Sequence, residues 1–228
     1  MLADIEQIRI GFIMILNSKQ VKAYSVLLAF VICGLAASTV SASKVVHLGI
    51  DFPFSNIIFS IFTYPIVDCI CELWGKPIAR QTVWIALGSQ LLVVLLLQLS
   101  VMMPHANFWQ NQPAYAMVLS VSGKVVTASF LAFLISQLLD IMLYQKIKNV
   151  FYGKLLWLRS NVSTFVGQII DSGIFVSIVF YGLPHKLHIL QGSIAVKIII
   201  SILMTPIVYL IVIGVDKYLK SETLAFKV

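Results

Sequence analysis

Apolar residues run in stretches of about 20 along the chain, separated by short polar or proline-containing segments. A stretch of that length can cross the hydrocarbon core of a membrane as a single helix. The pattern therefore predicts an all-α, polytopic integral membrane protein. We predict six transmembrane helices, over residues 23–41, 54–73, 82–103, 125–144, 160–182 and 194–215.

Two segments outside the predicted helices have a different pattern. Residues 1–22 alternate apolar and polar side chains, and we expect them to lie along the membrane interface, ahead of a six-helix domain over residues 23–228. Residues 104–124 contain two prolines and three aromatic residues, which favours an interfacial connector. Lys19 and Lys22 before the first span are also compatible with a signal peptide. That apolar run is long for a signal peptide and more spans follow, so we interpret it as the first helix.

The composition agrees with a membrane protein and argues against several soluble functions. Hydrophobic residues make up 60% of the 228 residues and charged residues only 11%, where soluble domains carry about 25% charged residues. Mean hydropathy is +0.97. The sequence has no Walker A loop, no GxGxxG and no HExxH motif, and its three cysteines lack the partners of a disulfide framework or a zinc site. We therefore expect no catalytic residue, no cofactor and no bound metal.

Basic residues are concentrated on one side of the predicted membrane topology. Six spans place both termini on the same side, and 12 of the 16 Lys and Arg residues then fall on that side. Because cytoplasmic loops carry an excess of Lys and Arg, this predicts that both termini face the cytoplasm, N-in and C-in. Topology accounts for most of the net charge of +7, so the charge does not indicate a nucleic acid partner.

The second and third predicted spans meet at a charged stretch, "DCICELWGKPIAR", over residues 68–80. Asp68 and Glu72 are four residues apart and therefore share one face of a helix. Gly75 and Pro77 end that helix, since proline lacks an N–H and restricts the residue before it. Asp68 therefore lies inside the membrane, whereas the residues after Gly75 reach the surface.

Polar side chains also recur at helical spacing within three later spans. Asp171 lies about 11 residues inside its span, roughly 16 Å at 1.5 Å per residue, and so near the middle of the bilayer. Pro206 can loosen the backbone of the last span. The polar positions are Ser129, Ser136, Gln137 and Asp140 in the fourth span, Asn161, Thr164, Gln168 and Asp171 in the fifth, and Lys197, Ser201, Thr205 and Tyr209 in the sixth.

Charged groups inside the membrane need a partner, because each costs at least ~2.5–3.5 kcal/mol near the bilayer centre on insertion scales. They could form buried ion pairs, for example Asp171 with Lys197, in a purely structural role. Acids and amides outnumber bases in these spans, which favours a transport pathway or a binding cavity. We expect one central cavity lined by Asp68, Asp140, Gln168, Asp171 and Lys197.

Three basic residues lie near the predicted cytoplasmic ends of the helices: Lys76, Arg80 and Arg159. Arg80 and Arg159 could pair with Glu72 and Asp140, which lie at similar depth on the same side, and so close the pathway toward the cytoplasm. Alternatively, these bases only extend to the membrane surface and set the topology.

A stripe of small residues marks the first span. Ala29, Cys33 and Ala37 recur at steps of four and so lie on one face of the helix. Small side chains let helices approach closely in membranes. We expect this face to pack against another helix, within the monomer or across a homodimer.

Four ordered motifs in four predicted spans give the sequence a resemblance to a known family. They are "DCICELWGKPIAR", "TASFLAFLISQLLD", "STFVGQIIDSGIF" and "VKIIISILMTPIVY", and the resemblance covers residues 50–215. The sequence resembles the queuosine-precursor transporters, also called the vitamin uptake transporter-like family. The positions that match the family pattern are Asp68, Glu72, Arg80, Asp140, Gln168, Asp171 and Lys197.

The resemblance implies a multi-pass protein of the inner (plasma) membrane that imports the deazapurines preQ0 and preQ1, or in some members queuine, for making queuosine in tRNA. A guanine-like edge presents N1–H and an exocyclic amine, which one carboxylate can accept together through charge-assisted bonds. Gln168 or Lys197 could donate to the carbonyl oxygen O6. Phe54, Tyr64 or Trp157 could stack on the ring, or could instead form an interfacial aromatic belt.

These observations leave three classes of function. The first is a secondary transporter for a small purine-like solute, and the second is a substrate-capture subunit of a multi-component, ATP-driven vitamin uptake system. The third is a membrane-embedded enzyme, for which the sequence lacks a nucleophile–base pair. We expect the solute and the lipid bilayer as partners. The candidate substrate-binding residues are Asp68, Glu72, Ser129, Gln137, Asp140, Asn161, Gln168, Asp171 and Lys197, and the candidate gate or topology charges are Lys76, Arg80 and Arg159.

Overall fold

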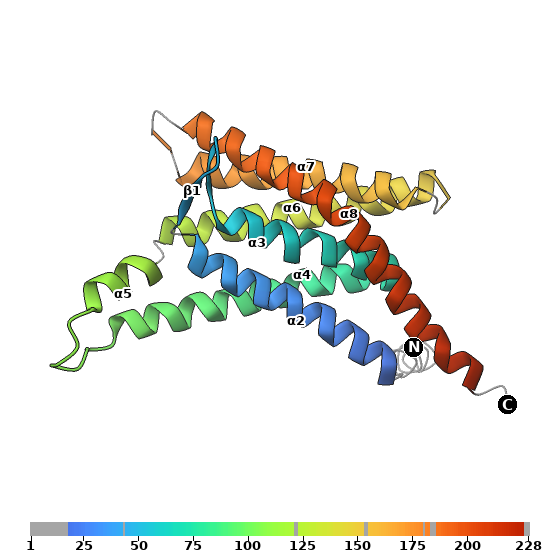
Figure 1. Cartoon of the computed structure of the whole chain (residues 1–228), viewed down its shortest axis with the longest axis horizontal. Coiled ribbons are helices and arrows are strands. Elements are labelled where there is room, and N and C mark those ends of the chain that lie inside the picture. Colours follow the sequence, from blue (N-terminus) through green and yellow to red (C-terminus); the bar gives the residue numbers. More distant parts are fainter. Residues whose placement is uncertain are drawn as a thin grey trace, which may run out of the picture.

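The structure of the chain is a computed structural model that describes residues 18–42, 44–120, 123–152, 155–179, 181–182 and 186–225. These residues form long helices and one small hairpin (Figure 1). The first part of the predicted interfacial segment, residues 1–17, lies outside the described residues. The elements are α2 (Ser18–Ser41), β1 (Val45–His47), β2 (Asp51–Pro53), α3 (Ser55–Phe62), α4 (Tyr64–Met102), α5 (Gln112–Leu119), α6 (Gly123–Val150), α7 (Leu156–Val179) and α8 (Lys186–Ala225).

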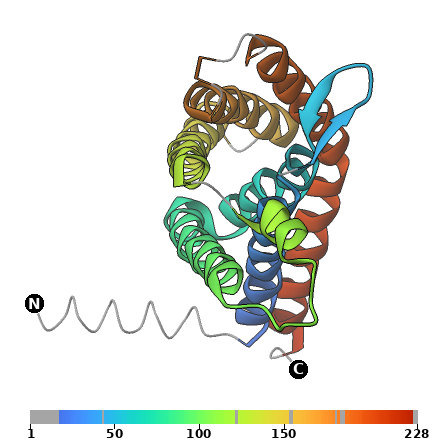
Figure 2. The ribbon, with the colours of Figure 1, turned by 90° about the vertical axis from the view of Figure 1, so that its left-hand side faces the viewer.

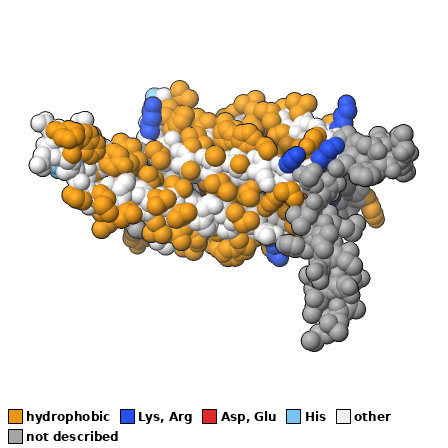
Figure 3. Space-filling model, turned by 90° about the horizontal axis from the view of Figure 1, so that it is seen from below, with side chains coloured by type: hydrophobic (Ala, Val, Ile, Leu, Met, Phe, Trp, Pro, Cys, Tyr) orange, Lys and Arg blue, Asp and Glu red, His pale blue; other side chains and the backbone are white. Residues whose placement is uncertain are grey.

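Five segments of the described chain are helical, long and apolar enough to cross a membrane. This makes the protein an all-α, polytopic membrane protein. The face seen in Figure 3 agrees, because apolar side chains are spread over its middle and the Lys and Arg side chains lie toward its ends. The five segments are Lys19–Ser41, Ser55–Met102, Gln112–Val150, Leu156–Val179 and Lys186–Lys220.

The longest of these segments, Ser55–Met102, is folded back on itself at Gly75, the break that the sequence predicts. Gly75 has φ 82° and ψ 176°, a conformation open only to glycine. The chain reverses there, so the two arms of α4 run side by side in opposite directions (Figure 1). Ile66 and Ile70 of the first arm therefore share one core with Val83 and Leu87 of the second.

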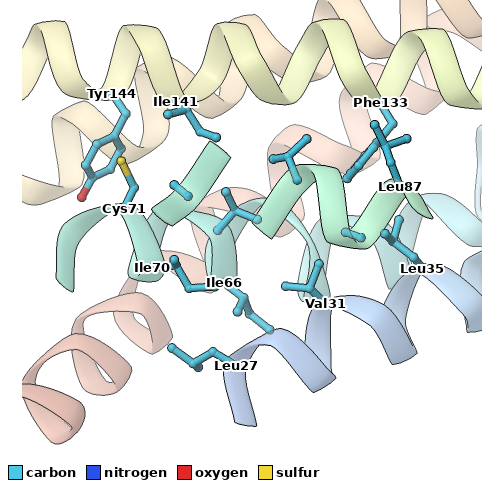
Figure 4. Close-up of a cluster of buried hydrophobic side chains, with 14 residues drawn as sticks. Leu27, Val31, Leu35, Ile66, Ile70, Cys71, Leu87, Phe133, Ile141 and Tyr144 are labelled. Carbon is cyan, nitrogen blue, oxygen red and sulfur yellow. The ribbon is translucent and has the colours of Figure 1, made fainter. Parts of the chain in front are cut away.

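The apolar core lies where α2, both arms of α4 and α6 meet (Figure 4). Leu27, Val31 and Leu35 lie on one face of α2 and point toward α4. Cys71 is buried in this core beside Tyr144 of α6, which fits the role of a small apolar side chain. The core fixes the positions of the helices whose other faces carry the polar residues.

A two-stranded hairpin was not predicted from the sequence. Val45–His47 pairs antiparallel with Asp51–Pro53, and the His47 Nδ1 atom lies 2.7 Å from the Asp51 carboxylate. Strands of three residues are too short to show an alternating pattern. The hairpin packs on α8 (Figure 2), where a Cβ added to Gly192 would lie 2.3 Å from the Asp51 carbonyl oxygen.

Candidate functional site

Polar residues of α3 and α4 form one continuous stripe through the interior. Asn56, Ser60, Tyr64, Asp68 and Glu72 follow each other at steps of four, so each lies on the same side as the next one in the series. Tyr64 and Ser60 are fully buried, and Asp68 is 1% exposed. The one-residue break at Thr63, between α3 and α4, does not interrupt the stripe.

Three further helices contribute polar stripes that meet this one. All their members below are buried except Ser129, which is half-buried. The result is a polar column inside an apolar shell, built from one face of each helix. Its members are Ser129, Gln137 and Asp140 on α6, Ser160, Thr164, Gln168 and Asp171 on α7, and Lys197 and Ser201 on α8.

A cavity opens at one end of the column. It holds about 840 Å³ of space, part of it open to the outside, and it lies between the C-terminal end of α2 and the N-terminal end of α6. Its walls mix aromatic, amide and charged groups, as small-molecule sites do. The polar side chains on its walls include Asn56, Gln90, Ser129, Asp171 and Lys197.

Asp171 and Lys197 form an ion pair in the wall of this cavity. The Lys197 Nζ lies 2.6 Å from the Asp171 Oδ2 and also donates to the Ser172 hydroxyl at 3.0 Å. The same ammonium lies 5.4 Å above the centre of the Phe59 ring. This is the ion pair that the structural interpretation of these residues predicts, and it lines the cavity as well.

Below the cavity, several buried polar groups have no hydrogen-bond partner among the described residues. They include the Tyr64 hydroxyl, both ends of the Gln137 amide and both oxygens of Asp140. The Gln168 carbonyl oxygen is also unpaired, although its amide nitrogen donates to the Ser201 hydroxyl at 2.7 Å. Buried polar groups are nearly always hydrogen-bonded, and each unpaired one costs about 1–3 kcal/mol. Such a concentration is typical of a site that acts on a polar ligand or ion.

Asp68 and Asp140 lie together at the next level of the column. Asp68 accepts hydrogen bonds from the hydroxyl groups of Ser160 and, at 3.3 Å, Thr164. Asp140 lies close to Asp68 and Thr164, but neither of its oxygens forms a hydrogen bond of good geometry. Gly167 lets α7 lie close to Asp140 and Tyr64, since a Cβ at this position would lie 3.3 Å from the Asp140 Cβ and 2.9 Å from the Tyr64 ring.

An ion cluster closes the column at the end opposite to the cavity. The Glu72 Oε2 accepts from the Arg159 guanidinium at 2.8 Å, the Lys148 ammonium at 3.0 Å and the Tyr144 hydroxyl at 2.9 Å. Arg159 is only 2% exposed, and its guanidinium lies 5.5 Å from the centre of the Tyr144 ring. The predicted pairing of Arg159 with Glu72 is therefore present.

The other predicted gate charges lie elsewhere. Arg80 is exposed and Lys76 is half-buried, and neither forms an ion pair with any residue in the described ranges. The Glu72 carboxylate is instead bonded, through Oε2, to Arg159, Lys148 and Tyr144. In this conformation Arg80 and Lys76 follow the alternative interpretation, in which they extend to the surface.

The predicted substrate-binding residues thus separate into distinct positions. Ser129, Asp171 and Lys197 line the cavity, whereas Gln137, Gln168, Asp68 and Asp140 are buried beneath it. Glu72 belongs to the ion cluster, and Asn161 is bonded to the Thr205 hydroxyl at 2.9 Å. Of the five residues expected to line one central cavity, Asp171 and Lys197 line this one, and the other three are buried outside its wall.

Several residues of the column were not predicted from the sequence. Asn56 and Ser60 continue the four-residue spacing of Asp68 and Glu72, and Tyr144 and Lys148 continue the spacing that runs through Asp140. These four residues could therefore have been predicted from the helical spacing. The hydroxyl that binds Asp68, on Ser160, is beside Arg159 at the start of α7, where a polar residue is ordinary and gives no signal.

Comparison with known proteins adds an independent line of evidence. Residues 53–211 match a family described as "Putative vitamin uptake transporter". A protein of Bacillus subtilis (strain 168) named "Probable queuosine precursor transporter" is 29% identical over 171 residues, which cover 73% of this chain and 74% of the relative. The "Queuosine precursor transporter" of Escherichia coli (strain K12) is 23% identical over 172 residues, covering 71% and 75%. No solved structure matches the chain significantly.

Proposed function

The chain belongs to the vitamin uptake transporter family and is a multi-pass protein of the plasma membrane, and we propose that it imports the 7-deazaguanines preQ0 and preQ1. Queuine, a third compound of this class, is an alternative solute. The names of the relatives support a queuosine precursor as the solute. Among the structural observations, the one that carries the proposal is the ion pair of Asp171 and Lys197 in the cavity wall.

The two charges of this pair match the edge of a guanine-like ring. The Asp171 carboxylate can accept N1–H and the exocyclic amine together, and the Lys197 ammonium can donate to the exocyclic carbonyl oxygen O6. Each charge-assisted bond contributes ~1.5–3 kcal/mol. Ser129, which also lines the cavity, adds a further hydroxyl. The solute then replaces part of the Asp171–Lys197 interaction with its own hydrogen bonds to the two charges.

The apolar part of the cavity suits the faces of the ring. Phe59 and Phe133 belong to the cavity wall, and their rings meet edge to face at 5.9 Å. Phe59 is therefore a better candidate for stacking than the aromatic residues chosen from the sequence. Trp157 is 51% exposed and Tyr64 is fully buried below the cavity.

For the membrane topology we propose six crossings with both termini in the cytoplasm. The reversal at Gly75 divides Ser55–Met102 into two arms, each long enough for one crossing. The start of α2 and the end of α8 lie at one end of the molecule (Figure 1). Lys148 and Arg159 mark that same end through the ion cluster, in keeping with the positive-inside rule. The cavity then opens to the outside and the ion cluster closes the cytoplasmic side.

Uptake by the purified chain in proteoliposomes tests this function. We expect radiolabelled preQ0 to accumulate inside, and unlabelled preQ1 to compete with it while adenine does not, because adenine offers an acceptor where guanine offers N1–H. Binding without uptake would instead indicate a substrate-capture subunit that needs an ATP-driven module. The absence of both binding and uptake would reject the proposal.

A further inference from the structure

The charges of the polar column do not balance when every acid is ionised. The column and its closed end contain four acids but only three bases among the described residues. A net charge inside a membrane protein is costly unless it is neutralised. The acids are Asp68, Glu72, Asp140 and Asp171, and the bases are Lys148, Arg159 and Lys197.

The excess negative charge lies on Asp68 and Asp140. Asp171 is paired with Lys197, and Glu72 is paired with both Arg159 and Lys148. No cation among the described residues contacts Asp68 or Asp140, and the bonds to Asp68 come from uncharged hydroxyl groups. Because the ion cluster has two bases for one acid, its excess positive charge offsets one of the two carboxylates and leaves the other uncompensated.

We propose that Asp68 and Asp140 together hold one exchangeable proton, and that this proton moves inward with the solute. The inference rests on the proposed import function and adds its driving ion. Two carboxyl groups side by side share a proton because both cannot ionise at close range. With that proton the column is neutral, and without it the column carries one negative charge.

Unpaired polar groups connect the acid pair to the cavity. Asp140 is 0% exposed with both oxygens unbonded, and the equally buried Gln137 amide and Tyr64 hydroxyl are also unbonded. Tyr64 lies against Gly167, which also contacts Asp140. A proton from the outer solution would enter through the cavity, form an O–H bond on a carboxylate oxygen of the pair, and leave to cytoplasmic water when the ion cluster opens.

Other titratable groups surround the pair but are already accounted for. Toward the cytoplasm these are Glu72, Tyr144, Lys148 and Arg159, which are bonded to each other. Toward the cavity lie Asp171 and Lys197, which pair with each other. The buried thiols of Cys69 and Cys71 follow Asp68 along α4. The acid pair is therefore the part of the column where a proton changes the net charge without breaking an existing ion pair.

Proton movement can be measured directly in the wild-type chain. Proteoliposomes containing a pH-sensitive dye receive preQ0, an uncharged solute, outside, with equal pH on both sides. We expect the lumen to acidify as preQ0 enters, and an imposed inside-alkaline gradient to raise its accumulation. Replacing sodium by choline should change neither signal.

Variants then locate the proton site. We expect Asp140→Asn to lose both the acidification and the response to the gradient, and Asp140→Glu, which keeps a carboxyl group, to retain them. The matched control is Asp216→Asn, an acid-to-amide change at an exposed pair with Lys220, which should behave as the wild type. Monodispersity and melting temperature in detergent establish that each variant is folded.

The outcomes separate this inference from the function on which it rests. Uptake of preQ0 by the wild type without acidification overturns proton coupling and leaves the import function standing. Uptake that requires sodium overturns it in favour of a sodium site. Acidification that persists in Asp140→Asn overturns the assignment to this pair. Absence of uptake in the wild type rejects the import function itself, and the inference with it.

Discussion

At the scale of single residues, the proposed binding site rests on the ion pair of Asp171 and Lys197. Both charges are nearly buried, with side-chain exposures of 10% and 5%, and both lie in a cavity wall. A buried charge that loses its partner is strongly destabilising. A solute that offers N–H donors to the carboxylate and an oxygen to the ammonium keeps both charges satisfied while it binds.

This gives a prediction for Asp171→Asn. The amide presents a donor where the solute also presents a donor, so we expect the affinity for preQ0 to fall by ~2–4 kcal/mol, or about 30- to 700-fold. Affinity should be measured together with the melting temperature in detergent. Unchanged affinity with a lowered melting temperature would show that Asp171 serves only to neutralise Lys197.

A second variant removes the stability problem from this test. In Asp171→Asn the ammonium of Lys197 is left buried without its carboxylate, whereas the double variant with Lys197→Met also removes that charge. We expect the double variant to regain melting temperature and not affinity. Recovery of both would place recognition elsewhere in the cavity.

The ion cluster around Glu72 leads to another prediction at this scale. Glu72→Gln leaves Arg159, which is 2% exposed, without its carboxylate, so we expect the free energy of unfolding to fall by about 1–3 kcal/mol. The loosened closure should also make a thiol introduced by Thr164→Cys more accessible to a reagent applied from the cytoplasmic side. Arg80→Gln is the matched control, because Arg80 is exposed and has no ion pair in the described structure, and should change stability by less than about 0.5 kcal/mol. Equal effects of the two variants would argue against a closure at Glu72.

At the scale of elements, glycine positions set how closely α6 and α7 approach. A Cβ at Gly167 would lie 2.9 Å from the Tyr64 ring and 3.3 Å from the Ser136 carbonyl oxygen, which is backbone and cannot move alone. Close approach at small residues is a general feature of membrane helices. Here it brings the stripe of α7 against Tyr64 and Asp140.

We therefore predict that Gly167→Ala lowers both the melting temperature and preQ0 uptake, since α7 must shift by several tenths of an ångström away from α4 and α6. Gly173→Ala on the same helix is the control, because no atom lies within 4 Å of its added Cβ. In a helix interior that change is worth up to about 1 kcal/mol in favour of alanine. If Gly167→Ala proves as harmless as the control, the close approach does not position the column.

The elements that could be predicted from the sequence are those with long apolar runs. The break at Gly75 could be predicted because glycine and proline interrupt such a run. The two arms of α4 meet at this break. The hairpin at Val45–His47 was missed because it is held by packing on α8 rather than by its own pattern. The length of α8 was also underestimated: the helix runs from Lys186 to Ala225, whereas the prediction from hydropathy covered only the apolar part, residues 194–215.

At the scale of the whole molecule, the polar column has a different structure at each end. One end opens into the cavity and the other is sealed by Glu72, Arg159 and Lys148. The sequence could predict which faces carry polar residues, because helical spacing fixes that. The sequence named candidate ion pairs, but spacing alone could not decide which of them form, because pairing depends on the relative height of neighbouring helices. Lys197 reaching Asp171 and Arg159 reaching Glu72, while Asp140 is left without a cation, are results of that stacking.

The direction of the column in the membrane gives the last prediction. If both termini are cytoplasmic, the hairpin tip lies outside and the turn at Gly75 lies inside. In a background with Cys33, Cys69 and Cys71 replaced by alanine, we expect Leu48→Cys to react with an impermeant maleimide in intact spheroplasts. Leu48 is 71% exposed, so its accessibility depends on the side of the membrane rather than on burial. Lys76→Cys should react only after the membrane is permeabilised.

The two positions together distinguish the possible arrangements. The opposite labelling pattern would invert the orientation, and the cavity would then face the cytoplasm, as expected of an exporter or of an importer in its inward-open state. Labelling of both positions from outside would mean that the first arm of Ser55–Met102 does not cross the bilayer, because the hairpin and Gly75 lie at its two ends. Only the predicted pattern places the open cavity where a precursor arrives and the ion cluster where it must be released.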